Sequence, residues 1–566
     1  MTIVAAHDLT DAALGARVCI IGSGAAGTTL ACELDGCGYE VLLLEAGGLR
    51  SDGRLTDYYR GEAEAPHPDP SQFRRIGFGG TTALWGGRCV PLDPLDFERR
   101  EYLSGSGWPI GYDELARYYP RAMEYCDAGR FDFTLHGSLA QPSPTISGFA
   151  GSEVVLADRI ERYSLPTNFG ARYRRKLHDS RNVRVVLQAR CLRLVKRRGE
   201  DRIAAAQIVD RTGRRRQVSA DIFVVATGGI EAPRLLLLSD EEGAGLGNRH
   251  DLLGRHYMCH FENNLGRLVP RGAQVAFDFE RTTDGVYCRR QLRFTAAALA
   301  EHRLLNTAFR LHFPSYSDAT HGSGVMSAIY LGKSLLLPEY RAIMQQDPYS
   351  PPSPNAAHVR NVLRGLPQVV RFAGDWLFRI QLARRKLPYT LVPHGDGSFP
   401  IEFNSEQAPR AVNRITLGSD TDTHGLRRVR IAWSLSEEEI AAARRALFLL
   451  RADINRSAAA ALEYDEEHMD ERLRSSPPLG GHHMGSARMG SSELSGVVDR
   501  NCMVFGLPNL FLASSAVFPT SGHANPTLTI VALAVRLGAH LRAALEEAPA
   551  QAIATVRSSA RPLETT

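Results

Sequence analysis

Short apolar runs alternate with glycine-rich turns at the start of the chain. Residues 18–21 (VCII) form an apolar run that stops at the turn GSGAAG, and the residues that follow predict a helix ending near Gly36 or Gly38. A second apolar run lies at 40–48, and a third at 221–229 leads into another predicted helix. This order of strand, glycine turn and helix indicates an α/β fold.

The middle of the chain has a different pattern. Residues 255–330 are rich in aromatic and β-branched side chains with irregular turns, which predicts an antiparallel sheet. Residues 347–358 are rich in proline and serine and predict a loop or a lid. Residues 359–386 predict a helix and carry seven basic residues against the single acid Asp375. A solvated helix face is the simpler interpretation of this basic segment, and contact with an anionic surface or partner is the alternative.

A long uncharged stretch near the C-terminus, 504–535, has the length of a transmembrane helix. Turn and helix-start residues interrupt it at Pro508, Pro519, Gly522 and Pro526. We therefore expect a buried core segment and no membrane span.

Composition narrows the class of protein. A chain of 566 residues exceeds the size of one simple core, so we expect two or more domains or one large interleaved unit. A hydrophobic fraction of 44% and a charged fraction of 23% are typical of globular proteins. The net charge is only +5, which indicates no nucleic-acid partner.

The cysteines and the two termini bear on location. The nine cysteines show no CxxC pair and no zinc-finger spacing, which favours a reduced cytoplasmic protein without a structural metal. The N-terminal residues lack the basic region and the sustained apolar run of a secretory signal, so we expect no secretion. Small polar residues at 548–566 predict a disordered tail.

The turn GSGAAG fits the dinucleotide-binding pattern GxGxxG through Gly22, Gly24 and Gly27. In this pattern the first glycine permits the tight turn, the second lets the backbone approach a pyrophosphate, and the third lets the helix pack on the strand. The pyrophosphate then lies on the N–H groups at the start of the helix. Glu45 ends the next strand eighteen residues after Gly27 and is expected to accept hydrogen bonds from the adenosine ribose. The residues alone leave NAD and FAD open.

Two other segments carry candidate chemistry. Residues 74–98 are glycine-rich around a single tryptophan, Trp85, which fits either close backbone approach to a flat ring system or a plain loop. Residues 480–490 (GGHHMGSARMG) contain two adjacent histidines among glycines. These histidines fit three roles: metal ligands, an acid/base pair, or part of a turn. Farther on, Asn525 and Pro526 are typical of a helix cap and of the first helical position.

In these segments the chain resembles the glucose-methanol-choline (GMC) oxidoreductases. The similar blocks follow one another along nearly the whole chain: GSGAAG, GGTTALWGG, WPIGYDELARYYPRA, VVATGGIEAPRLLL, NSEQAPRAVNRITL, and HHMGSARMG followed by NPTLT. The blocks WPIGYDEL and FPTSGHANPT resemble the bacterial sugar-oxidising and pyranose-oxidase-like branch more than the choline dehydrogenases. The resemblance implies FAD as the cofactor.

The resemblance also implies the domain organisation. We expect an α/β fold in which a discontinuous Rossmann-like FAD-binding domain is interleaved with a substrate-binding cap domain built on an antiparallel sheet. The FAD-binding domain is expected to take 1–110, 180–255 and 478–547, the cap domain 111–179 and 256–477, and the tail 548–566.

Catalytic roles follow from the same resemblance. The block HHMGSARM fits the family pattern H-x-x-G-[ST]-x-x-M, whose leading histidine faces the flavin, so His482 is the expected base. Adjacent residues in an extended segment point in opposite directions, so His483 does not share that position. The second catalytic residue maps to Asn525, while His523 is expected in the loop and not at the substrate. No carboxylate or cysteine set stands at a suitable spacing, so we expect no metal.

The resemblance implies a set of FAD-binding residues spread over the blocks. They are Gly22, Gly24, Ala25, Ala26, Gly27, Glu45, Ala46, Gly80, Thr81, Trp85, Gly86, Gly87, Cys191, Thr227, Gly228, Ser514, Asn525, Pro526 and Thr527. Some pyranose oxidases attach FAD covalently through a histidine where this chain has Leu84, so non-covalent FAD is expected. The helix that begins at Pro526 is expected to direct its N–H groups at the flavin and to favour the charge of reduced flavin.

These assignments imply oxidation of an alcohol. His482 takes the hydroxyl proton, Asn525 donates a hydrogen bond to the substrate oxygen, and hydride passes to flavin N5. The expected substrate is a small sugar, aminosugar or polyol, and the electron acceptor is O2 or another acceptor. Two alternatives stay open: a lyase-like protein without redox turnover, and a non-enzymatic flavoprotein whose contact surface is 359–386.

Overall fold

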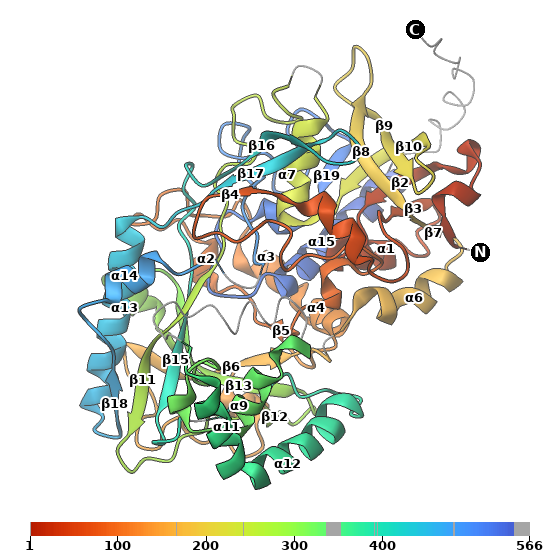
Figure 1. The fold of residues 1–566 in the computed structure, drawn as a ribbon. Helices are drawn as coiled ribbons and strands as arrows, with labels where there is room; N and C mark the ends of the chain where they lie inside the picture. Colours follow the sequence, from red (N-terminus) through yellow and green to blue (C-terminus); the bar gives the residue numbers. More distant parts are fainter. Residues whose placement is uncertain are drawn as a thin grey trace.

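The computed structural model places most of the chain in two large sheets with helices around them (Figure 1). It describes residues 2–165, 167–240, 243–335, 352–389, 391–392, 394–478 and 481–547. The predicted tail 548–566 lies outside these residues, as do residues 347–351 of the predicted loop 347–358. The last four residues of that loop belong to a helix that begins at Asn355.

The first sheet has the strand order β1-β7-β3-β2-β10-β9-β8, and β19 pairs with β10. Its first five strands and β19 run parallel, whereas β9 and β8 join the sheet antiparallel. The bounds are β1 Ile3–Ala5, β2 Gly15–Ile21, β3 Val41–Leu44, β7 Val183–Leu187, β8 Ala189–Lys196, β9 Ile203–Asp210, β10 Arg215–Val225 and β19 Leu510–Leu512. The apolar runs at 18–21 and 40–48 therefore form central strands, because helices cover the sheet.

Helices on this sheet begin where glycine turns end the strands. Helix α1 (Ala25–Glu33) follows β2, and α7 (Gly228–Leu238) follows β10, as predicted. Helix α15 (Thr527–Glu547) crosses α1 closely, because a Cβ at Gly538 would lie 2.8 Å from Cβ of Glu33. The remaining helices here are α3 Tyr112–Ala116, α4 Tyr119–Cys126 and α6 Phe169–Asp179.

The second sheet has the order β18-β11-β15-β14-β13-β6-β5, with β12 beside β13, and all its pairs are antiparallel. The bounds are β5 Arg88–Cys89, β6 Val155–Tyr163, β11 Phe261–Pro270, β12 Glu280–Arg281, β13 Tyr287–Phe294, β14 Thr307–Leu311, β15 Phe399–Ser405 and β18 Ala460–Glu463. The antiparallel sheet predicted for 255–330 is present and takes further strands from both sides of that range. The exact domain limits stay a prediction.

Helix α13 (Glu437–Arg456) packs against the second sheet and shares its apolar core through residues such as Leu447 and Leu450. A third, small sheet joins β16 (Arg414–Thr421), β17 (Arg427–Ala432) and β4 (Gly61–Ala63). Shorter helices are α2 Pro94–Phe97, α5 Leu135–Ser138, α8 Ala296–Glu301, α9 Gly324–Leu331 and α14 Met469–Arg474.

The uncharged stretch 504–535 is part of the core, as predicted. It contains β19 and the first half of α15, and most of its residues are buried. Among the described residues, α15 is the one helix long and apolar enough to cross a membrane by composition, and 67% of its apolar window is buried inside the protein. This burial is typical of a core helix.

The basic segment 359–386 is helical, as predicted, but it is not one helix. Helix α11 (Asn355–Arg364) ends at Gly365, and α12 (Leu366–Asp375) continues into a π-helical turn, Trp376–Gln381. The break has a packing reason, because Cα of Gly324 in α9 lies 3.1 Å from where a Cβ on Gly365 would stand.

Candidate active site

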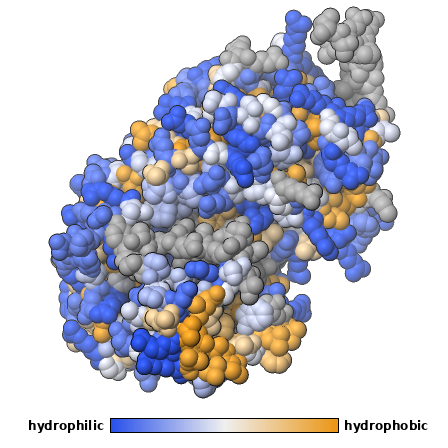
Figure 2. Space-filling model, viewed as in Figure 1, coloured by the Kyte–Doolittle hydropathy of each residue, from blue (hydrophilic) through white to orange (hydrophobic). Residues whose placement is uncertain are grey.

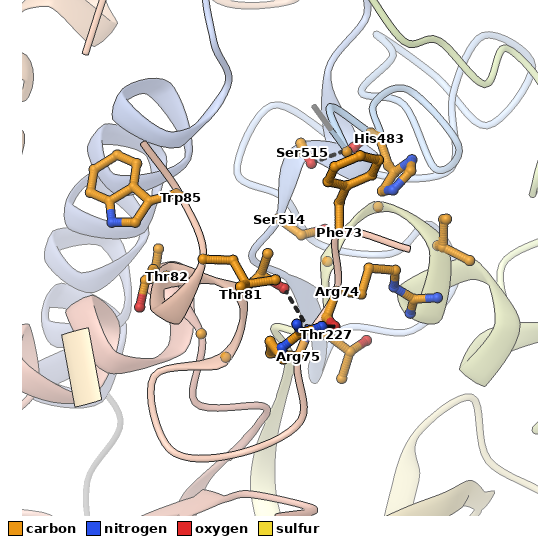
Figure 3. A pocket seen from close by; sticks show the side chains of 18 of the residues that line it. Phe73, Arg74, Arg75, Thr81, Thr82, Trp85, Thr227, His483, Ser514 and Ser515 are labelled. Atoms are coloured by element: carbon orange, nitrogen blue, oxygen red, sulfur yellow. Dashed lines mark hydrogen bonds between the residues drawn. The ribbon is translucent and has the colours of Figure 1, made fainter. Parts of the chain in front are cut away.

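A cavity of about 680 Å³ lies where the carboxyl ends of the central parallel strands meet the second sheet. Every predicted FAD-binding residue except Gly27 lines it, and so do His482 and Asn525. Its walls also include the loop 73–88 and residues of β11 and β15. Figure 3 shows this loop beside the segment that carries Ser514 and Ser515. This volume lies within the range of about 300–1,000 Å³ that is usual for small-molecule and cofactor sites.

The glycine turn has the backbone geometry that a dinucleotide site needs. Gly22 has a φ of +102°, and a Cβ there would lie 2.7 Å from the carbonyl oxygen of Ala226. A Cβ on Gly27 would lie 1.9 Å from the carbonyl oxygen of Gly22, which explains its place beneath the cavity wall. Gly24 instead has open space in its Cβ direction, and α1 begins beside it without a side-chain cap. The first N–H groups of α1 are therefore available for a phosphate.

Glu45 braces the glycine turn from within the protein. Its Oε1 accepts hydrogen bonds from the N–H groups of Gly47 (2.8 Å) and Gly77 (3.0 Å). Its Oε2 accepts from the N–H (3.3 Å) and the hydroxyl (2.5 Å) of Ser23. Burial raises the pKa of Glu45, and these hydrogen bonds oppose that rise. Because four protein donors already occupy the carboxylate, the predicted ribose contact requires the Ser23 hydroxyl to turn away.

The loop 73–88 approaches the glycine turn at Gly80, where an added Cβ would lie 3.0 Å from Cα of Gly24. The hydroxyl of Thr81 accepts a hydrogen bond from the N–H of Arg75 (3.3 Å; Figure 3). The indole of Trp85 donates to the carbonyl of Thr167 (2.9 Å), so its polar edge is used by the protein. This loop places Phe73, Arg74 and Arg75 on the cavity wall, which the sequence pattern did not indicate.

The cavity wall also has polar and glycine positions without partners among the described residues. The Thr227 hydroxyl is buried without a hydrogen-bond partner among the described residues, and Gly228 and Gly86 have open space in their Cβ directions. Cys191 and Ser514 line the same cavity. The cavity thus combines open space with two kinds of hydrogen-bond donor, the unpartnered hydroxyl and the free N–H groups of a helix N-terminus. A large dinucleotide cofactor such as FAD fits this combination.

A chain of hydrogen bonds fixes the orientation of His482. Nε2 of His260 lies 3.4 Å from the carbonyl oxygen of Ser521, Nδ1 of His260 lies 2.9 Å from Nδ1 of His482, and Nε2 of His482 lies 2.9 Å from Nδ2 of Asn525. Burial lowers the pKa of His260 to about 3 and that of His482 well below 6.5, so both rings are neutral.

The proton positions follow from these contacts. A carbonyl oxygen only accepts, so His260 carries its proton on Nε2, and its Nδ1 accepts from the Nδ1–H of His482. The Nε2 lone pair of His482 then accepts from the Asn525 amide. His482 and Asn525 thus place an imidazole lone pair and an amide donor side by side in the cavity wall.

His483 also lines the cavity (Figure 3), but its ring has other hydrogen-bond partners than that of His482, in line with the alternation argument. Its Nδ1 lies 2.6 Å from the hydroxyl of Tyr257, which also contacts Nε2 of His67 (3.0 Å) and the thiol of Cys259 (3.2 Å). The ligand atoms of His67, Cys259 and His483 lie within 4.8 Å of one another. The Tyr257 hydroxyl already lies within hydrogen-bond distance of two of them and near the thiol, so these side chains form a buried hydrogen-bonded cluster.

His523 is buried beyond the cavity wall. Both its ring nitrogens lack a hydrogen-bond partner among the described residues, and Nε2 lies 3.6 Å from Asp93. Burial lowers its pKa well below 6.5. It does not belong to the cavity lining.

The second sheet contributes a charged wall that the sequence patterns missed. Glu262, the second residue of β11, lines the cavity two residues after His260. No hydrogen bond reaches the Glu262 carboxylate from the described residues, and its nearest cation, Arg88, is 3.9 Å away. Burial and the neighbouring Glu402 raise the pKa of Glu262. Glu402 itself is held by Arg310 (3.2 Å), so Glu262 is the less compensated carboxylate of the two.

Comparisons with known proteins agree with this geometry. Residues 409–534 match the family model described as GMC oxidoreductase. The chain is 25% identical to 2-methyl-1,2-propanediol dehydrogenase of Mycolicibacterium austroafricanum, over 94% of this chain and 96% of that protein. It is 23% identical to paromamine 6'-oxidase of Streptomyces fradiae, over 92% and 90%. Its fold is similar to that of pyridoxine 4-oxidase from Mesorbium loti, with a TM-score of 0.51, 17% identity, and coverage of 93% of this chain and 98% of that one.

Proposed function

Because the chain belongs to the GMC oxidoreductases, enzymes that act on alcohol and sugar CH–OH groups, we propose that it oxidises a sugar, an aminosugar or a polyol to the carbonyl, with His482 as the base. The observation that carries this proposal is the position of the His482 ring, whose Nδ1 contacts Nδ1 of His260 (2.9 Å) and whose Nε2 contacts Nδ2 of Asn525 (2.9 Å) in the cavity wall. The family implies FAD, and the glycine cradle, the orphaned Thr227 hydroxyl and the uncapped start of α1 fit it.

Each side chain then has one task in the proposed reaction. FAD, when bound, supplies the hydride acceptor. A substrate hydroxyl takes the place of the Asn525 amide at Nε2 of His482 and gives its proton to that atom. The released amide of Asn525 donates to the substrate oxygen as negative charge develops there. The cavity wall holds the reacting carbon in position.

Anaerobic titration tests this function. The purified holoprotein is mixed with sugars, aminosugars, polyols and simple alcohols while flavin absorbance is followed. Bleaching by one class supports the proposal and names the class. An intact flavoprotein that stays oxidised with every class would favour the lyase-like or non-enzymatic alternatives. Repeating the active reaction with O2 and with an artificial dye separates an oxidase from a dehydrogenase.

We further propose non-covalent FAD, because Leu84 offers no nucleophile. Acid precipitation of the yellow holoprotein is expected to leave all the flavin in the supernatant, as measured by its absorbance. A pellet that keeps the flavin colour after washing would contradict the proposal. The variant Leu84→His is the matched comparison, since it restores an imidazole at the position in question.

Glu262 is proposed to bind a hydroxyl or ammonium donor of the substrate, because it lines the cavity and no described residue donates a hydrogen bond to its carboxylate. Glu262→Gln keeps the shape and removes the charge. It is expected to raise KM about tenfold for an aminosugar and less for the corresponding neutral sugar, since hydrogen bonds to a charged acceptor are worth about 1.5–3 kcal/mol. Steady-state kinetics on glucosamine and glucose, or on the pair that the titration identifies, measure the two effects. Equal KM values for wild type and variant on both substrates would contradict this role.

The scattered free cysteines also support a cytoplasmic location as a proposal. Tagging the protein in cells and separating the fractions tests it.

A further inference from the structure

One helix of the structure lies on the surface without a single buried residue. Helix α12 (Leu366–Asp375) has no buried residue, although five of its ten residues are apolar. It touches α9 and continues into the π-helical turn Trp376–Gln381. Figure 1 places α12 at the outer end of the molecule, remote from the first sheet. An amphipathic helix normally turns its apolar side chains toward the core, so this exposure needs an explanation.

Exposed apolar side chains concentrate on this part of the chain. Of the thirteen large apolar residues that are exposed in the described part of the chain, eight lie between 359 and 382: Val359, Leu363, Leu366, Val370, Trp376, Leu377, Phe378 and Leu382. Leu363, Val370, Phe378 and Leu382 are each at least 65% exposed. Figure 2 shows apolar surface gathered at the same end of the molecule. Single exposed apolar residues are ordinary, but a contiguous patch marks an interaction site.

Positive charge is interleaved with these apolar side chains. Arg360, Arg364, Arg371, Arg379, Arg384 and Lys386 are exposed. None of these six has a carboxylate partner within the part of the chain that the structure describes, whereas the seventh basic residue, Arg385, pairs with Asp127. The segment holds one acid, Asp375, so its excess of positive charge is larger than the net +5 of the whole chain. We call residues 359–386 the basic apolar face.

We propose that the basic apolar face binds the surface of an anionic lipid bilayer. In this contact the apolar side chains enter the boundary between headgroups and acyl chains, and the long arginine side chains extend back to the phosphates. Anionic headgroups supply the negative charge that the described residues do not place beside these cations. The contact lies on the surface and requires no membrane-spanning helix.

The charge pattern favours a bilayer over a protein partner. The six exposed cations are spread along the whole face from Arg360 to Lys386 and alternate with exposed apolar residues, as in helices that lie in the interface of a bilayer. A second copy of this chain is disfavoured as well, because a two-fold contact would bring two strongly basic faces together. A bilayer supplies both an apolar layer and a dense anionic surface, without needing a matched shape.

The full-length holoprotein is to be sedimented with vesicles of phosphatidylcholine and with vesicles of phosphatidylcholine and phosphatidylglycerol in equal parts. We expect binding to the anionic vesicles to be at least tenfold stronger. The double variant R371Q/R379Q is expected to weaken it by about 25-fold, since each cation near the surface contributes about fivefold. F378S/L382S should weaken binding while leaving its dependence on lipid charge. R174Q/R175Q removes two exposed arginines from α6 instead, and it should bind as the wild type does.

Salt gives a test that needs no variant. Raising the ionic strength from about 0.1 M to about 1 M shortens the Debye length from about 10 Å to about 3 Å, so binding to the anionic vesicles should fall sharply. Absence of binding to either vesicle, or equal weakening by R371Q/R379Q and R174Q/R175Q, would overturn the proposal. Self-association of the wild type that F378S/L382S abolishes, without vesicle binding, would assign this face to a protein contact instead.

Discussion

Replacing His482 with glutamine is expected to lower kcat by about 10²- to 10⁴-fold, the usual contribution of a positioned general base. Glutamine retains a polar side chain next to Asn525 but offers no basic lone pair at the position of Nε2. The proton of the substrate hydroxyl then has no acceptor when hydride leaves the carbon that bears this hydroxyl. The measurement is the rate of anaerobic flavin bleaching by the best substrate, with flavin content determined first to show that the fold is intact.

The neighbouring histidine supplies the control for this experiment. His483 comes from the same turn, but its ring contacts Tyr257 and not Asn525. His483→Gln is therefore expected to change the bleaching rate less than tenfold. If His483→Gln abolished bleaching and His482→Gln did not, the roles assigned to the two residues would be reversed.

The low pKa of His482 also shapes the pH dependence. Burial lowers it well below 6.5, so the ring stays neutral as the pH falls through the range in which a free histidine gains its proton. The wild-type kcat at saturating substrate is accordingly expected to hold its value from about pH 7 down to about pH 6, whereas kcat/KM also reports the carboxylate of Glu262, whose pKa is raised. A half-maximal point of kcat near pH 6.5 would show an exposed, unperturbed base.

Local patterns were enough to predict the parts of the site that are continuous in sequence. The turn with Gly22, Gly24 and Gly27 has its backbone geometry imposed by close contacts within the turn and to Ala226, so the spacing of the glycines already specifies it. The uncharged stretch 504–535 was assigned to the core because prolines and glycine interrupt it, and α15 is indeed buried.

The parts that were missed depend on contacts between distant strands. Glu262 reaches the cavity, and His260 reaches His482 behind the cavity wall, through the placement of β11 beside β15 in the second sheet, and no local pattern specifies which face of β11 meets the cavity. The ring orientation of His482 depends on Ser521 and His260, which are 261 residues apart. The basic segment shows the same limit, since its helical character was predicted but its exposure depends on how α9 and α11 pack. Glu45 was expected to face a ribose, and its four protein donors could not be counted from spacing.

His260 is a positioning residue, and His260→Leu is expected to lower kcat by about 10² -fold or more with little change in KM. Leucine removes the acceptor that holds the proton of His482 on Nδ1. The ring is then free to carry its proton on Nε2 and donate it to the Asn525 oxygen, which has no partner among the described residues. In that tautomer no lone pair faces the substrate hydroxyl, although the cavity that binds the substrate is unchanged.

His260→Asn separates this role from simple packing. The amide oxygen of asparagine lies near the position of the replaced Nδ1 and can accept the Nδ1–H of His482, so this variant should recover most of the lost kcat. A purely structural role predicts the reverse order, because leucine fills a buried site better than the smaller polar asparagine. Steady-state kcat and KM for both variants, measured at equal flavin content, decide between the two. Loss of kcat in both variants alike would show that His260 acts through packing and not through the tautomer of His482.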